Sequence, residues 1–244
     1  MPDARLVPAP VFILSPIRSG STLLRCLLGS HPDVHAPHEL HLGGLTVTVN
    51  DEFTDLSMRT LNLGREDLEH LLWDRLLHRQ LTEAGKTVLA EKSPGNVFIW
   101  RRLVDCWPGA RFIILRRHPV AIADSIRRAG DATDLTGAAV TVDKFATALD
   151  EAAANVPTSI SVTYEQLTAE PEAICKALCE FIGISWDPAM LDYGRHDHGP
   201  FVYGIGDWSP QIASGRIQDA TPPPADATIP PLLRQWCETW GYPA

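Results

Sequence analysis

Residues 18–22, Arg-Ser-Gly-Ser-Thr, place a guanidinium group, a glycine and three hydroxyl groups within one short stretch. An apolar run at residues 11–14 precedes it, and residues 23–28 continue as Leu-Leu-Arg-Cys-Leu-Leu. This order predicts a buried strand, a tight loop and a helix that begins near Ser21. The N-terminus of a helix has unpaired N–H groups and a partial positive charge, so it binds anions. We therefore predict an anion site formed by Arg18, Ser19, Gly20, Ser21 and Thr22.

This loop departs from the loop that binds nucleoside triphosphates in ATPases and small-molecule kinases. That loop has the pattern G-x-x-x-x-G-K-[ST], in which the lysine reaches the outer phosphates. When Gly20 and Thr22 are aligned with the pattern, Ser15 stands at the first glycine and Ser21 at the lysine. Because γ-phosphoryl transfer depends on that lysine, the loop favours anion binding without ordinary ATP chemistry.

A second stretch that could hold an anion is RFIILRRHPVAIADSIRR, at residues 111–128. Its apolar residues predict a strand that ends near Arg117, and Pro119 suits the first turn of a following helix. Ser125 lies in that helix, eight residues after Arg117. An arginine and a helical hydroxyl can together hold a phosphate group. The alternative is a solvated helix face, since eight basic and only two acidic residues lie between positions 92 and 128.

Four histidines crowd residues 31–41, which include His38-Glu39-Leu40-His41. Zinc proteases use H-E-x-x-H, in which two residues separate the glutamate from the second histidine. A single residue separates Glu39 from His41. We therefore predict no metal site in this stretch.

The elements that position these residues follow from the hydrophobic pattern. Short apolar or β-branched segments predict buried strands at residues 11–15, 88–91, 112–116 and 159–163. Amphipathic patterns predict helices at residues 21–29, 66–83, 119–129, 142–155, 170–182 and 232–240, with Gly183 ending the fifth. The alternation predicts an α/β fold with three layers, α/β/α, around a central, mainly parallel sheet, as in P-loop nucleoside triphosphatases. Such sheets bind ligands at the carboxyl ends of their strands, where both candidate anion sites lie.

The 244 residues are expected to form one domain, with a proline-rich connector at residues 219–231 before the last helix. The net charge of −9 argues against nucleic acid as a partner, and no apolar run is long enough for a membrane span. The first residues do not resemble a secretory signal. Five cysteines without paired spacing predict reduced, buried thiols, with Cys175 and Cys179 on one helix face. These features predict a cytoplasmic protein and leave its oligomeric state open.

The first loop carries a resemblance to a known family. SPIRSGSTLLRCLLGSHPDV, at residues 15–34, resembles the 5′-phosphosulfate loop of the sulfotransferase superfamily, whose typical form is P-R-S-G-[ST]-[ST]-L-L. These enzymes take a sulfuryl group from 3′-phosphoadenosine 5′-phosphosulfate (PAPS). LRRHPVAIADS, at residues 115–125, is similar to the 3′-phosphate motif of that superfamily. The resemblance assigns the 3′-phosphate to Arg117 and Ser125. One departure is Ile17, which is inserted between Pro16 and Arg18 and could shift Arg18.

Three further stretches match in the same order. EKSPGN (91–96) resembles the segment at the end of the second strand, and VTYEQLTAEPEAICKALCEFIGI (162–184) resembles a structural stretch. GIGDW (204–208) resembles the loop that closes over the donor, which implies donor contacts from Gly206 and Asp207. The R-K-G that precedes this loop in cytosolic members is replaced by Phe-Val-Tyr at residues 201–203. Residues 43–85 and 209–231 match nothing in the superfamily, and we expect acceptor contacts there.

The resemblance also implies roles in catalysis. The resemblance is strongest to small-molecule sulfotransferases of bacterial biosynthetic pathways. It implies that Glu39 is the base, with His41 and His38 as alternatives. Lys92 and Arg18 would stabilise the departing phosphate, and no metal is required. The sequence thus predicts sulfuryl transfer from PAPS to a hydroxyl group of a small-molecule acceptor. The alternatives are a small-molecule kinase of the P-loop class and a nucleotide-binding scaffold without turnover.

Overall fold

Five parallel strands form the sheet of the computed structural model, which describes residues 5–202, 204–206, 209–223 and 229–243. The strands are β1 (Val11–Leu14), β2 (Val34–His35), β3 (Val88–Glu91), β4 (Arg111–Arg116) and β5 (Ser159–Thr163). Their order in the sheet is β2-β3-β1-β4-β5, and each neighbouring pair is parallel. The four predicted strands are confirmed to within one residue. The sequence missed β2, because two residues are too few to show a period.

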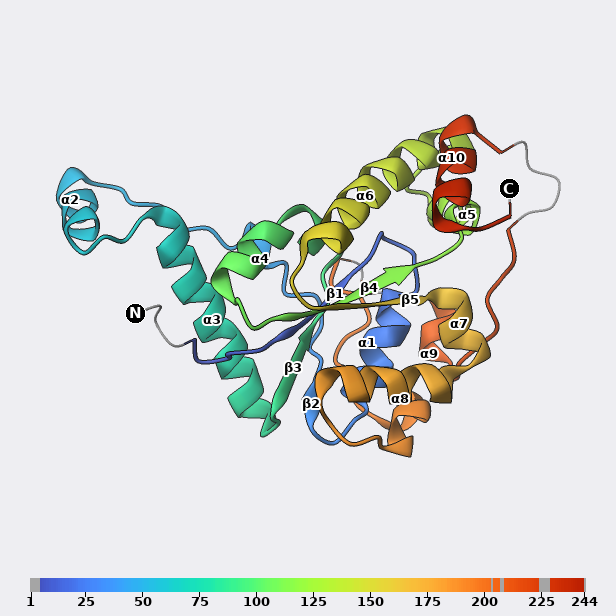
Figure 1. Ribbon diagram of the computed structural model, residues 1–244, viewed down its shortest axis with the longest axis horizontal. Coiled ribbons are helices and arrows are strands. Elements are labelled where there is room, and N and C mark those ends of the chain that lie inside the picture. Colours follow the sequence, from blue (N-terminus) through green and yellow to red (C-terminus); the bar gives the residue numbers. More distant parts are fainter. Residues whose placement is uncertain (1–4, 203, 207–208, 224–228, 244) are drawn as a thin grey trace.

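The residues of β1 alternate between the two faces of the sheet, and both faces are covered. Val11 and Ile13 pack with helices α1 (Ser21–Gly29), α7 (Tyr164–Ala169) and α8 (Pro171–Ile182). Phe12 and Leu14 pack against α3 (Arg65–Ala84), α4 (Trp100–Cys106) and α6 (Leu135–Asn155). Figure 1 shows these helices on both sides of the strands. This arrangement confirms the predicted α/β/α fold, and it explains why β1, at the centre of the sheet, is apolar at every position.

Most predicted helices are confirmed. α1 and α5 (Pro119–Ala129) have the predicted bounds, α3 is one residue longer at each end, and α8 and α10 (Pro231–Trp240) differ by one residue at their start. α6 begins at Leu135 rather than at residue 142, since the side chain of Asp134 caps it by accepting from Gly137 N at 2.8 Å. The sequence missed short elements that show little periodicity: α2 (Glu52–Thr60), α4, α7, α9 (Pro210–Ala213), η1 (Leu42–Gly44), η2 (Pro94–Phe98), η3 (Pro188–Leu191) and η4 (Tyr193–Arg195).

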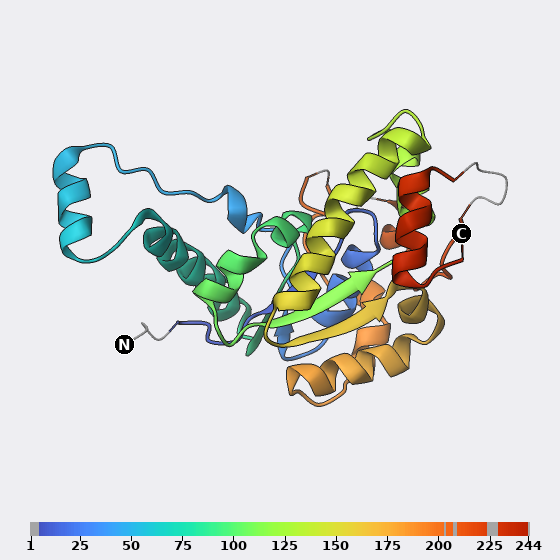
Figure 2. The same cartoon turned by 45° about the horizontal axis from the view of Figure 1, so that its top comes forward.

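The segment between η1 and α3 extends away from the sheet. In Figures 1 and 2 it carries α2 to the far end of the molecule, and none of the residues of α2, all of which the structure describes, is buried. The base of the segment is fixed, because Trp73 Nε1 donates to Leu45 O at 2.9 Å and Val47 N donates to Glu69 Oε1 at 3.0 Å. The tip exposes apolar side chains, Phe53 and Leu56 among them.

The cysteines are buried, as predicted. Cys175 and Cys179 lie on the inner face of α8, and burial raises the pKa of the Cys175 thiol to about 12. None of the described helices combines the length and the apolar character that crossing a membrane requires.

Truncating α1 tests its packing against the sheet. Leu27 is fully buried in the cluster on this face, so Leu27→Ala should lower the free energy of unfolding by about 2–5 kcal/mol. Leu56→Ala removes the same atoms from the exposed side chain on α2 and should change it by less than about 0.5 kcal/mol. Urea denaturation measures both, and equal effects would contradict this packing.

Candidate active site

The loop between β1 and α1 has two residues in the left-handed region of the backbone. Arg18 has φ of 59° and Gly20, the N-cap of α1, has φ of 87°. A Cβ atom at Gly20 would overlap the ring of Tyr164, so both its φ and the space around it require glycine. Ser19 is buried, and its hydroxyl donates to Pro16 O at 2.7 Å. The two left-handed residues turn the chain sharply and bring the first turn of α1 to the carboxyl edge of the sheet.

Two pockets meet at this loop. The first, here the arginine pocket, is lined by Arg18, Gly20, Leu23, Arg117, Ser125, Arg128, Tyr164, Tyr193, Ser209, Gln211, Ile212, Arg216, Gln218, Asp219 and Thr221. The second, here the Glu39 pocket, is lined by Ile17, Arg18, Gly20, Ser21, Thr22, Glu39, His41, Lys92, Pro94, Gly95, Asp131, Gly204 and Gly206. Arg18 and Gly20 line both, so a group bound at the loop would be accessible from either side.

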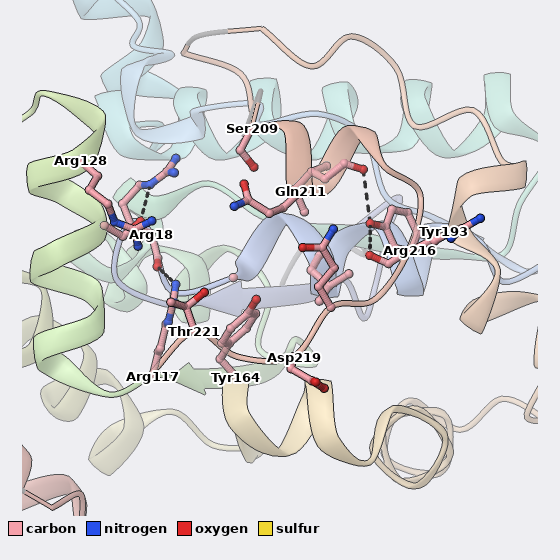
Figure 3. A pocket seen from close by; sticks show the side chains of 15 residues that line it. Arg18, Arg117, Arg128, Tyr164, Tyr193, Ser209, Gln211, Arg216, Asp219 and Thr221 are labelled. Carbon is pink, nitrogen blue, oxygen red and sulfur yellow. Dashed lines mark hydrogen bonds between the residues drawn. The ribbon is translucent and has the colours of Figure 1, made fainter. Parts of the chain in front are cut away.

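Three arginines gather at one end of the arginine pocket, opposite Tyr193 and Arg216 (Figure 3). Arg18 Nε donates to Ser125 Oγ at 3.3 Å, and Arg117 Nη1 donates to the carbonyl oxygen of Arg18 at 2.9 Å. Arg117 also stacks on the ring of Tyr164, with 4.5 Å from Cζ to the centroid. The predicted 3′-phosphate residues are thus together, next to the loop.

Arg117 has spare capacity for a ligand. Its Nε is buried and has no hydrogen-bond partner among the described residues. Burial lowers the pKa of its guanidinium group, and the negative charge of Glu165 opposes this shift. A buried guanidinium group with an unused donor is costly unless an anion binds it. This end of the pocket is therefore suited to phosphate or sulfate.

Lys92 and Glu39 form a buried ion pair in the Glu39 pocket. Lys92 Nζ also donates to Thr22 Oγ1 at 3.2 Å, so one ammonium group contacts both the carboxylate and the first turn of α1. Burial lowers the pKa of Lys92, and the charge of Glu39 opposes this shift. The sequence placed Thr22, Glu39 and Lys92 in one site, and the structure brings them together.

The two histidines proposed as alternatives to Glu39 lie differently. His41 Nε2 is 2.5 Å from Gly204 O and 3.4 Å from Glu39 Oε2, within the Glu39 pocket. The ring of His38 forms a hydrogen bond with the carbonyl oxygen of Glu39. His38 is not among the described residues that line either pocket. Of the two, His41 is the one placed to contact a substrate.

The remaining predicted residues are distributed around the loop. Ser21 and Gly206 line the Glu39 pocket, whereas Ser19 is not among the described residues lining either pocket. Asp207 lies outside the described residues. The inserted Ile17 packs against the cluster of α5, α6 and α10 and lines the Glu39 pocket. Arg18 follows it with its guanidinium group directed at Ser125.

Sequence reasoning missed the part played by the C-terminal tail. Seven residues of the tail at 209–231, from Ser209 to Thr221, line the arginine pocket, and none of its described residues lines the Glu39 pocket. Tyr193 holds this tail in place, since its hydroxyl is 3.3 Å from Ile212 O and 3.1 Å from Arg216 O. Contacts to carbonyl oxygens leave no mark in the sequence, so nothing there pointed to them.

Comparison with known proteins decides the family. The family model described as Sulfotransferase family matches residues 10–188, which include the loop, Glu39, Lys92, Arg117 and Ser125. The chain belongs to the sulfotransferase family.

Relatives of this sulfotransferase are longer than the chain. Nodulation protein NoeE of Sinorhizobium fredii is 32% identical over 136 residues, which cover 51% of the chain and 32% of NoeE. Protein-tyrosine sulfotransferase 1 of Danio rerio is 24% identical over 198 residues, covering 75% of the chain and 55% of the relative. The chain thus spans between a third and about half of the length of these two relatives.

Solved structures confirm the fold. The sulfotransferase domain of the Synechococcus PCC 7002 olefin synthase superposes with a TM-score of 0.72 at 24% identity, covering 100% of this chain and 98% of that one. The sulfotransferase domain of the curacin biosynthetic pathway gives 0.69 at 20% identity, covering 97% and 98%. Mouse sulfotransferase SULT7A1, complexed with PAP, gives 0.53 at 12% identity, covering 98% and 87%. The predicted resemblance to sulfotransferases, including those of bacterial biosynthetic pathways, is confirmed.

Variants of two glycines separate the two reasons why the loop requires glycine at position 20: its positive φ and its contact with Tyr164. Gly20→Ala and Gly85→Ala both place a Cβ atom at positive φ, which costs about 1–2 kcal/mol. The Cβ at Gly85 would project into open space, whereas the one at Gly20 would displace Tyr164 from beneath Arg117. Urea denaturation should show a larger loss for Gly20→Ala. Equal losses would mean that the ring of Tyr164 moves aside without cost.

Proposed function

We propose that this sulfotransferase moves a sulfuryl group from PAPS to a hydroxyl group of a small-molecule acceptor. The observation that carries the proposal is that the arginine pocket and the Glu39 pocket meet at Arg18 and Gly20. A donor in the first pocket and an acceptor in the second would then face each other across the phosphate loop, as an in-line displacement requires.

The chemistry of the arginine pocket supports PAPS as the donor. Arg117 and Ser125 offer charged and hydroxyl donors to the 3′-phosphate, and Arg117 has an unused, buried N–H group. The first turn of α1 offers N–H groups to the 5′-phosphosulfate, together with the hydroxyl groups of Ser21 and Thr22. The mouse sulfotransferase, which shares this fold, was solved in complex with PAP, the product that PAPS leaves after transfer. Gly206 and Asp207 belong to the loop that we expect to close over the donor.

Glu39 and Lys92 supply the groups that transfer needs. Glu39 takes the proton of the acceptor hydroxyl as the acceptor oxygen forms its bond to sulfur. The bond between sulfur and the bridging oxygen breaks, and the electron pair leaves with the 5′-phosphate of PAP. Lys92 and Arg18 stabilise the charge on that phosphate. Because the leaving group is already a stabilised phosphate, these side chains suffice without a metal.

The Glu39 pocket supports a small molecule as the acceptor. Its volume is about 410 Å³, within the range of small-molecule sites. Its wall combines uncharged residues, Ile17, Pro94 and Gly95 among them, with charged ones. The acceptor is therefore a compact alcohol with an apolar part.

We also infer that the chain acts as one domain, in a biosynthetic pathway in the cytoplasm. α10 packs on α5 and α6, which supports the single domain, and buried thiols suit a reducing compartment. The two structural neighbours with the higher TM-scores come from biosynthetic enzymes.

Removing Arg117 tests the donor. Arg117→Ala should weaken binding of PAP by about 10- to 100-fold, because it removes charge-assisted hydrogen bonds to the 3′-phosphate. Binding of adenosine 5′-phosphate, which lacks that group, should change little. Calorimetric titration measures both, and Arg127→Ala, on the helix α5 that follows Arg117 but outside the described lining of the pocket, is the control. Wild-type preference for ATP–magnesium over PAP would contradict the proposal and favour the kinase.

Removing the base tests catalysis. Glu39→Gln should lower sulfuryl transfer by about 100- to 10,000-fold while PAP binding stays within about twofold. Transfer to water, followed as sulfate released from 35S-labelled PAPS, needs no identified acceptor. His38→Gln, whose side chain lies outside the described lining of both pockets, should retain the wild-type rate. Full activity in Glu39→Gln would show that Glu39 is not the base. A wild-type protein that binds PAP but has no turnover would favour the nucleotide-binding scaffold.

A further inference from the structure

A buried carboxylate lies behind the segment that carries Glu39. Glu91, the last residue of β3, is fully buried. Its Oε1 accepts from Leu40 N at 3.1 Å and from Ser93 Oγ at 2.7 Å, and its Oε2 accepts from Asn96 Nδ2. Burial raises the pKa of Glu91, and the hydrogen bonds from these three donors oppose that shift, so the donors favour the ionised carboxylate.

Ser93 extends this network to the next residue of the segment. While its hydroxyl donates to Glu91, its oxygen accepts from His41 N at 2.9 Å. His41 has φ of 49° and ψ of 49°, a left-handed conformation that is unfavourable for a residue other than glycine. The hydrogen bond from His41 N stabilises this turn, which directs the side chains of Glu39 and His41 into the same pocket.

Other contacts hold the segment before this turn, and on the turn itself the ring of His41 contacts Gly204 O. Arg25 Nη1 donates to Ala36 O at 3.0 Å, and Glu39 N donates to Ile205 O at 3.2 Å. On the C-terminal side of Glu39, the side chains of Glu91 and Ser93 receive the two successive N–H groups of Leu40 and His41. Because Lys92 lies between them in the chain, the same strand end presents the cation to Glu39 and fixes the backbone that carries Glu39.

We propose that Glu91 is a positioning residue for sulfuryl transfer: with Ser93 and Asn96 it holds the 39–41 turn so that the Glu39 carboxylate meets Lys92 and the acceptor. This inference rests on the proposed function. Glu91 contacts neither pocket in the described part of the chain, so it acts through the backbone of Leu40 and His41.

Removing the acceptor oxygens tests the hydrogen-bond network. Glu91→Leu has a similar volume and leaves Leu40 N, Ser93 Oγ and Asn96 Nδ2 without this acceptor. We expect sulfate release from labelled PAPS to fall by about 10- to 100-fold, since a displacement of about 1 Å at a reacting group costs this much. PAP affinity should stay within about twofold of wild type, because the arginine pocket is untouched.

Glu91→Gln separates hydrogen bonding from charge. Its carbonyl oxygen still accepts from Leu40 N and Ser93 Oγ, and its N–H group donates to Asn96 once that amide turns its oxygen toward position 91. We expect Glu91→Gln to keep a rate at least about tenfold above that of Glu91→Leu. A role limited to burying negative charge behind Lys92 predicts the same loss in both variants, because both are neutral.

Ser93 provides a second test should Glu91→Leu fold poorly. Ser93→Ala removes the acceptor for His41 N and should lower the rate, whereas Ser93→Thr keeps the hydroxyl and should restore it. Both variants should bind PAP as wild type does. A wild-type rate in Ser93→Ala, or in Glu91→Leu, would overturn the inference.

Crystal structures separate this inference from the proposed function. In Glu91→Leu the Glu39 carboxylate should leave Lys92, and in Glu91→Gln it should stay. An unchanged contact between Glu39 and Lys92 in Glu91→Leu overturns the inference whatever the donor is. A wild-type protein that fails to bind PAP instead overturns the proposed function, and the structural comparison still decides whether Glu91 positions Glu39.

Discussion

The ammonium group of Lys92 lies where water does not reach, and the site is arranged around compensating its charge. Removing a lysine from water costs several kcal/mol, and losing one partner of such a buried pair costs roughly 3–5 kcal/mol. Glu39 supplies the opposite charge and Thr22 a hydroxyl oxygen. The position of Glu39 therefore contributes to the stability of the fold. Glu39 keeps this position only if the turn at residues 39–41 is held, and buried residues at the end of β3 and just after it hold this turn.

The parallel sheet explains how residues so far apart in the chain reach one site. In a parallel sheet, all carboxyl ends lie at the same edge. The phosphate loop follows β1, Glu39 follows β2, Lys92 follows β3, Arg117 follows β4 and Tyr164 follows β5. One part of the site thus follows each strand. The strand order β2-β3-β1-β4-β5 places these parts on two sides of the loop after β1. Glu39 and Lys92 lie on one side of the loop, and Arg117 and Tyr164 lie on the other, which produces two pockets that share the loop.

Two segments outside this sheet have different roles. The tail at residues 209–221 covers the arginine pocket and is tied down by Tyr193. The segment that carries α2 begins directly after η1, next to His41, and extends away from the sheet. Its base is buried through Trp73 and Glu69, while its tip is exposed. Neither segment showed a family motif, because neither is built on a strand end.

The sequence by itself determined the local elements and the chemical identity of the site. Periodicity located four of the five strands, and the Arg-Ser-Gly-Ser-Thr loop and the Arg117–Ser125 spacing indicated two anion sites, because these features depend on neighbours in the chain. Only the tertiary structure decided that Arg117 donates to the backbone of Arg18, that the tail covers the arginine pocket, and that Glu91 lies behind Glu39. These contacts join residues tens of positions apart, largely through backbone groups that every residue possesses. A side-chain pattern cannot encode them, so the packing of the strands had to place them.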